Sequence, residues 1–164
     1  MSGQKKTPVA IFIGSTSDLD KIKPATSCLK NFSIDYLAYI ISAHRGPELL
    51  EEKVKQLGDH QVQVIIAAAG MSAHLAGVIA SKTWQPVIGL PLSGGFLGLD
   101  ALLSMTQMPS QIPVATVAID GAVNAAMLAV QILASNDNNL KEKIIKHRKE
   151  LANSFNKLNQ GQAF

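Results

Sequence analysis

Short, almost wholly apolar runs alternate with longer mixed segments along most of the chain. The first run, residues 9–14, is rich in valine, isoleucine and phenylalanine, and a helix-like segment follows it to about residue 31. Four more apolar runs repeat this order, with strands expected at 36–41, 62–68, 86–90 and 114–118 and helices at 48–57, 73–83, 99–107 and 121–134. Apolar runs bounded by turn residues are typical of strands buried on both faces. The pattern therefore predicts five strand–helix units.

The alternation of apolar strands with helices indicates the fold class. Such strands belong to a parallel sheet that helices cover on both faces. Because crossovers between parallel strands are right-handed, the predicted fold is a doubly wound α/β domain. Ligands of such domains bind at the carboxyl ends of the strands, so the loops after the strands are the places where we expect a site.

The segment 137–158 has a different pattern. Among its lysines and asparagines runs one apolar stripe, formed by Leu140, Ile144, Leu151, Phe155 and Leu158. A stripe at this spacing is typical of an amphipathic helix. The five preceding units already make a complete domain, so this helix can pack on its own subunit or on a neighbouring one. We expect a single domain over 1–164, with an α/β core at 8–135.

Charged side chains are scarce in the second half of the chain. Between residues 62 and 135 only Lys82, Asp100 and Asp120 are charged. A monomer rarely leaves so large an apolar surface exposed, so the composition predicts a homo-oligomer. The net charge is only +3, and the lysines lack the interleaved aromatic residues of a single-strand binding groove. Nucleic-acid binding therefore gains little support.

The single cysteine and the lengths of the apolar runs bear on location. Cys28 has no second cysteine with which to form an intrachain disulfide, and no Cys/His cluster has zinc-ligand spacing. No apolar run has the position and length of a secretory signal or the ~20 residues needed to cross a bilayer. We expect a cytoplasmic protein without a structural metal and without contact with a membrane.

The loop after the first strand reads GSTSD at 14–18. Free backbone N–H groups and the dipole at the start of a helix attract anions, and serine hydroxyls add donors. The loop is thus a candidate phosphate site. Ser17 or Asp18 as a simple helix cap is the alternative, and local sequence alone favours it.

The loop after the second strand reads SAHRGP at 42–47 and is expected to lie beside the first loop. Arg45 can form a bidentate contact with a phosphate, and Ser42 can donate to it. The imidazole of His44 can give up and take back a proton during a reaction. A surface turn stabilised by Gly46 and Pro47 explains the same residues equally well.

The third and fourth loops add weaker candidates. Residues 69–75 combine small side chains with His74, in the first turn of an expected helix, where a structural histidine is the commoner explanation. Residues 91–98 are glycine-rich and can either close over a ligand or serve as a flexible connection. The chain has no dinucleotide-binding, Walker-type or nucleophile-elbow motif, which argues against those classes of enzyme.

Taken together, these loops resemble the bacterial-type 5-(carboxyamino)imidazole ribonucleotide mutases, the class I PurE family. The resemblance covers about residues 8–135. Five segments carry it: GSTSD at 14–18, SAHRGP at 42–47, AHL at 73–75, GLDALLSMTQMP at 98–109 and IPVATVAID at 112–120. Any one of these segments can arise by coincidence, but five in this order on one α/β chain are hard to explain otherwise.

The resemblance implies a flavodoxin-like, three-layer fold assembled as a homo-octamer, with the C-terminal helix reaching an adjacent subunit. It implies an isomerase of purine biosynthesis that moves a carboxylate from the exocyclic nitrogen of its ribonucleotide substrate to the neighbouring ring carbon. No ATP, metal or organic cofactor takes part. His44 is then the acid and base, and eight residues contact the substrate: Ser15, Asp18, Ser42, Arg45, Ala69, Gly70, His74 and Leu75.

The chain departs from the family pattern at the carboxylate pocket and its covering loop. Met71 and Ser72 stand where glycine or alanine is usual, Ala76 replaces proline, Gly46 replaces threonine, and the segment 90–100 is about one residue short.

Two other functions remain in competition, namely a carboxylase that uses free carbon dioxide and a phosphate-binding module without catalysis. The resemblance also raises the prospect of functional coupling to the ATP-dependent carboxylating enzyme that supplies the substrate.

Overall fold

A computed structural model describes residues 7–158, and its centre is a sheet of five parallel strands. Along the sheet the strands stand in the order β2-β1-β3-β4-β5, the flavodoxin-like order. Their bounds are β1 (Val9–Ile13), β2 (Tyr36–Ile40), β3 (Val64–Gly70), β4 (Val87–Leu92) and β5 (Ala115–Thr116). The doubly wound parallel fold predicted from the sequence is confirmed.

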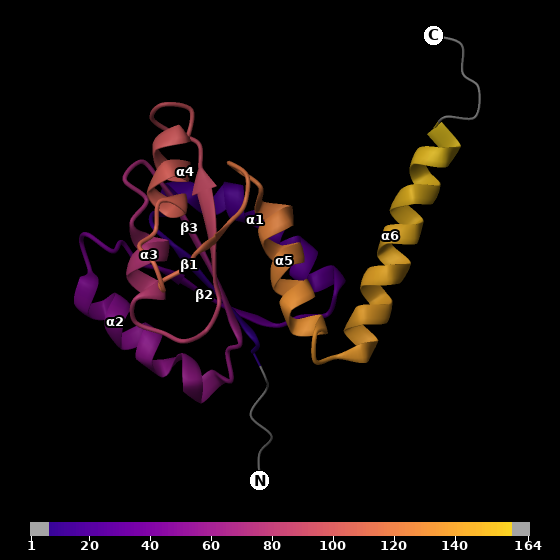
Figure 1. Ribbon diagram of the computed structural model, residues 1–164, viewed down its shortest axis with the longest axis horizontal. Helices are drawn as coiled ribbons and strands as arrows, with labels where there is room; N and C mark the ends of the chain where they lie inside the picture. The colour runs from indigo at the N-terminus through magenta and orange to yellow at the C-terminus, as the bar shows by residue number, and fades with distance from the viewer. Residues whose placement is uncertain (1–6, 159–164) are drawn as a thin grey trace.

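Helices follow the strands and cover both faces of the sheet (Figure 1). They are α1 (Leu19–Asn31), α2 (Pro47–Lys55), α3 (Leu75–Ala80), α4 (Leu99–Thr106), α5 (Ala122–Ala134) and α6 (Asn138–Leu158), with short 3₁₀ turns η1 (Thr16–Asp18) and η2 (Gln56–His60). Helices α1 and α5 lie on one face and α2, α3 and α4 on the other, which gives three layers.

The central strands are apolar throughout because both of their faces are buried. Along β1, Val9, Ile11 and Ile13 belong to the core under α1 and α5, whereas Ala10 and Phe12 belong to the core under α2 and α3. This alternation is the normal geometry of a strand, whose successive side chains point to opposite faces. The two cores fix the sheet between the helical layers and so hold the loops at its carboxyl edge.

Two elements are shorter than the sequence pattern predicts. Strand β5 has only two residues, Ala115 and Thr116, which pair with Ile88 and Gly89 of β4. Helix α3 begins at Leu75 because the preceding residues form a turn in which the His74 N–H donates to the Ser72 carbonyl. It ends at Ala80, where the Ser81 hydroxyl donates to the Val78 carbonyl.

Helix α6 packs on the body of the protein only through its first turns. Leu140 and Ile144 are buried in the core that contains α1 and α5, and the helix then extends away from the body (Figure 1). Leu151 and Phe155, further along the predicted stripe, are 52% and 58% exposed. The side chain of Leu158 lies outside the described residues. Among residues 7–158, no helix is both long and apolar enough to cross a membrane.

Candidate active site

A cavity of about 870 Å³ opens at the carboxyl edge of the sheet, where the loops after β1, β2, β3 and β4 meet. All nine residues that the sequence singled out line this cavity: Ser15, Asp18, Ser42, His44, Arg45, Ala69, Gly70, His74 and Leu75. Four polar residues that it did not single out as site residues line the cavity as well: Ser17, Lys21, Ser72 and Ser93. The fold thus brings polar and ionisable side chains from four loops into one cavity.

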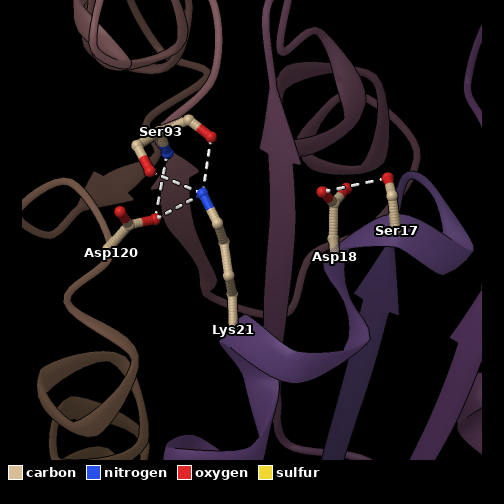
Figure 2. Close-up of polar contacts among 5 residues, drawn as sticks. All are labelled: Ser17, Asp18, Lys21, Ser93 and Asp120. Atoms are coloured by element: carbon tan, nitrogen blue, oxygen red, sulfur yellow. Dashed lines mark hydrogen bonds and ion pairs between the residues drawn. The ribbon is translucent and has the colours of Figure 1, made fainter.

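The first loop places hydroxyl groups and a carboxylate at the start of α1. Ser15 has extended backbone, and its Oγ accepts hydrogen bonds from the Ser17 N–H (3.3 Å) and the Ser17 hydroxyl (2.9 Å). The cap of the 3₁₀ turn is therefore Ser15, and neither Ser17 nor Asp18 has the capping role that the sequence allowed. The Asp18 carboxylate stays directed at the neighbouring Ser17 hydroxyl, 3.4 Å away (Figure 2).

The second loop is a tight turn that presents its side chains to the cavity. The Ser42 hydroxyl accepts a hydrogen bond from the Arg45 N–H, and the Ser42 carbonyl accepts one from the Gly46 N–H. Pro47 then stands at the first position of α2, where its missing N–H costs nothing. The Arg45 guanidinium has no hydrogen bond or ion pair with any residue in 7–158, so it is a cation available to an anionic ligand.

The third loop brings His74 against His44. The Nε2 of His44 and the Nδ1 of His74 are 2.9 Å apart, and the two rings meet edge to face at 85° with centroids 5.0 Å apart. At this distance one imidazole donates the hydrogen bond and the other accepts it, so the tautomer of one ring determines the role of the other. Both side chains are exposed to the cavity.

The contact between the two histidines could not be read from the sequence, which treated each as a separate candidate. It depends on the strand order, because β1 lies between β2 and β3, so the loops after β2 and β3 meet across the end of β1. A β-carbon on Gly14 would lie in ordinary contact with the Ala69 side chain, 3.5 Å away, so the first and third loops are close neighbours. Lys21 was missed for a similar reason. The structure is needed to see that the first turn of α1 places Lys21, like Asp18, in the lining of the cavity.

Within the described part of the chain, no group of three or more His, Cys, Asp or Glu side chains is placed to hold a metal ion. The site's ionisable groups are instead two cations, one carboxylate and the histidine pair. Of the two cations, Lys21 is paired with Asp120, 3.3 Å away, whereas Arg45 is unpaired among residues 7–158. An anionic ligand is therefore expected at the Arg45 end of the cavity.

Comparisons with known proteins agree on one family. Residues 8–154 match the family model described as AIR carboxylase. The chain is 50% identical over 144 residues to the N5-carboxyaminoimidazole ribonucleotide mutase of Pyrococcus abyssi, covering 87% of this chain and 83% of that protein. It is 44% identical over 143 residues to the mutase of Bacillus subtilis, with 85% and 88% covered. A crystal structure of Treponema denticola PurE superposes with a TM-score of 0.83 at 30% identity, covering 91% and 94% of the two chains.

Proposed function

The chain belongs to the AIR carboxylase family, and we propose that it is an N5-carboxyaminoimidazole ribonucleotide mutase of purine biosynthesis. The reaction is an isomerisation, in which the carboxylate on the exocyclic nitrogen of the substrate moves to the adjacent ring carbon. Relatives with this name match the chain over most of its length. The proposal needs a group that gives up a proton and takes one back within the same cycle.

The observation that carries the mechanism is the pair of histidines in the cavity. His44 protonates the exocyclic nitrogen as the nitrogen–carbon bond breaks and carbon dioxide leaves. The ring carbon then attacks the trapped carbon dioxide, and His44 removes the proton from that carbon. The proton count is balanced, so one residue serves as acid and then as base.

The contact with His74 supports this double role. The Nδ1 of His74 lies 2.9 Å from the Nε2 of His44, so the two rings share one hydrogen bond. His74 thereby fixes the ring orientation of His44 and the tautomer that faces the substrate. We propose that it also walls off carbon dioxide together with Ala69, Gly70 and Leu75, because escape into water would make the enzyme a decarboxylase.

The other cavity residues suit the ribonucleotide. Ser15, Ser42 and Arg45 are proposed to bind the phosphate, since hydroxyl donors and a guanidinium complement its charge and geometry. Asp18 is proposed to accept hydrogen bonds from the ribose hydroxyls. The four side chains come from two adjacent loops, and the second of these loops also carries His44.

We propose further that the chain works as a cytoplasmic homo-octamer without a cofactor, as the resemblance implies. The support is the scarcity of charge between residues 62 and 135 and the exposed apolar side chains on α6. Functional coupling to the carboxylating enzyme that supplies the substrate is part of the same proposal, because a nitrogen-bound carboxylate of this type is easily lost.

The test supplies purified protein with N5-carboxyaminoimidazole ribonucleotide, without ATP or bicarbonate, and follows the carbon-carboxylated product. Wild type is expected to turn over, and His44→Asn is expected to lose roughly 10²- to 10⁴-fold in kcat, the usual contribution of a positioned acid–base group. His74→Asn is expected to fall between the two. Substrate affinity, measured by calorimetry, is expected to persist in both variants.

His60→Asn is the matched control, because His60 ends the 3₁₀ turn η2 and does not line the cavity. It is expected to behave as wild type. If product forms only from aminoimidazole ribonucleotide and bicarbonate, the protein is a carboxylase and not a mutase. Binding without turnover under either condition would leave the phosphate-binding module.

A further inference from the structure

The glycine-rich loop (residues 93–98) forms one wall of the cavity through Ser93 and Gly94. Between its ends the loop is weakly attached. Phe96 and Leu97 are 85% and 87% exposed, and both have positive φ. The carboxylate of Asp100 lies beside Gly95, and its buried Oδ1 has no hydrogen-bond partner among the described residues. The position of this wall therefore depends on the contacts at the ends of the loop.

At its first residue the loop is held by two side chains from separate parts of the fold (Figure 2). The Lys21 ammonium, on α1, donates to both the carbonyl and the hydroxyl of Ser93, each 2.5 Å away. The Asp120 carboxylate, after β5, accepts a hydrogen bond from the Ser93 N–H at 2.9 Å and forms an ion pair with Lys21 at 3.3 Å. All the polar groups of Ser93 are thus engaged by the Lys21–Asp120 pair.

The carboxylate of Asp120 is itself held in place. Its backbone has φ of +53°, a left-handed conformation that aspartate tolerates better than most residues, and its N–H donates to the Pro91 carbonyl of β4. Burial alone would raise the pKa of Asp120, but hydrogen bonds from Ser93 and the Lys21 charge outweigh burial and lower it. The carboxylate is therefore charged at neutral pH, as the ion pair requires.

The far end of the loop packs against the same segment. Gly98 has φ of +86°, and a β-carbon there would lie 2.8 Å from the Ile119 side chain and 3.0 Å from the Ser93 Cα. Both ends of the loop thus meet at the junction of β4 with residues 119–120. Through its hydrogen bonds to Ser93, Lys21 connects this junction to α1. Helix α1 directly follows the loop that carries Ser15 and Asp18.

We propose that Lys21 and Asp120 are positioning residues that hold the glycine-rich loop against the cavity and so keep carbon dioxide confined during the reaction. The proposal rests on the mutase function proposed above. In this ion pair the negative charge of Asp120 offsets the positive charge of Lys21. Without it, Lys21 would compete with Arg45 for the substrate's anionic groups. Neither residue needs to touch the reacting atoms.

Two variants test the proposal from opposite sides of the network. Lys21→Met removes the ammonium and keeps the length of the side chain. Asp120→Gly removes the carboxylate at a backbone position that suits glycine. Lys23→Met is the control, because Lys23 lies on the same helix and pairs with an aspartate, Asp20, but is 74% exposed and does not line the cavity.

The first readout is amide hydrogen exchange in the protein without substrate, which does not depend on the enzymatic reaction. Exchange of the Ser93 amide is expected to rise about tenfold or more in Asp120→Gly, which removes its acceptor. It is expected to rise as well in Lys21→Met, which removes both the hydrogen bonds to the Ser93 oxygens and the ion pair that holds the Asp120 carboxylate. Exchange in Lys23→Met is expected to match wild type. Unchanged exchange at 93–98 in both Lys21→Met and Asp120→Gly would overturn the proposal, whatever the activity.

The second readout is the fate of the carboxylate during turnover. Both variants are expected to raise the ratio of decarboxylated aminoimidazole ribonucleotide to product about tenfold, with KM nearly unchanged, because a displacement of about 1 Å in a supporting group can change rates by up to a hundredfold. A mobile loop with no added leakage would overturn the confinement role. A wild type that makes no product would instead refute the proposed function, and the exchange measurement would still decide whether the pair holds the loop.

Discussion

At the scale of single residues, strained backbone concentrates around the cavity. Seven described residues other than glycine have positive φ, and four of these lie on the cavity or in the segments that shape it: Met71, Phe96, Leu97 and Asp120. Such conformations cost free energy and persist where the surrounding structure imposes them. The strain therefore marks the third loop, the glycine-rich loop and the residue that holds it as the parts of the fold shaped by the site.

Met71 offers a direct test of this strain. Its φ is +57° and its side chain is 67% exposed, so it loses backbone free energy while gaining little from packing. The left-handed conformation costs a residue with a β-carbon roughly 1–2 kcal/mol, and the greater freedom of glycine in the unfolded chain costs about 0.5–1 kcal/mol. Met71→Gly is therefore expected to raise the free energy of unfolding by up to about 1 kcal/mol, measured by urea denaturation.

Met71→Ala separates the backbone effect from the side chain. Alanine keeps the β-carbon and hence the strain, so this variant is expected to unfold close to wild type. If Met71→Ala stabilises the protein as much as Met71→Gly, the gain comes from removing an exposed apolar side chain and the argument from strain fails.

At the scale of elements, the join between β4, α4 and β5 is closely packed around Gly89. A β-carbon on Gly89, in β4, would lie 2.9 Å from the Val114 side chain and 3.0 Å from the Met105 sulfur. Both distances are shorter than van der Waals contact, so a methyl group must displace the Val114 and Met105 side chains. Gly89→Ala is expected to lower the free energy of unfolding by about 1–3 kcal/mol, the usual cost of overpacking a core.

The control for this prediction is Gly58→Ala. Gly58 lies in η2, has ordinary φ, and would place its β-carbon in open space. Its unfolding midpoint in urea is expected to equal or slightly exceed that of wild type. Equal losses in the two variants would show that backbone freedom, and not packing against Met105 and Val114, explains the effect.

The sequence predicted these elements well where burial is complete. Strands β1, β3 and β4 are apolar along their whole length because both faces are covered, and their runs were visible at once. The short β5 was overestimated because the apolar residues around it, such as Val114 and Val117, pack against the core without extending the pairing with β4. Hydrophobicity records burial, whereas strand length depends on pairing.

The candidate site was predictable to the level of its loops but not of its contacts. Parallel strands bring the ends of β1, β2 and β3 together, so the loops carrying Ser15, His44 and His74 had to converge. The 2.9 Å contact between the histidines and the grip of Lys21 on Ser93 join residues 30 and 72 positions apart. No local pattern records such contacts, since they arise from strand order and side-chain conformation.

At the scale of the whole molecule, α6 is the feature that a monomer explains least. Only its first turns are buried, and a cavity of about 650 Å³ lies between it and the layer formed by α1 and α5. Leu151 continues the apolar stripe beyond this contact and is 52% exposed. An amphipathic helix that leaves half of its stripe uncovered is expected to bury it against another copy of the chain.

Substitution of Leu151 tests this expectation, because burying one leucine is worth about 1.5–3 kcal/mol. Leu151→Lys is expected to weaken self-association by roughly ten- to a hundredfold, seen by sedimentation velocity as smaller species at concentrations where wild type stays assembled. Asn153→Lys adds the same charge at an exposed polar position on the same helix and is expected to assemble as wild type. Dissociation of both variants would point to charge repulsion along α6. A monomeric wild type would show that the protein does not form the proposed oligomer. If only Leu151→Lys dissociates, the exposed half of the stripe is the surface on which the subunits meet.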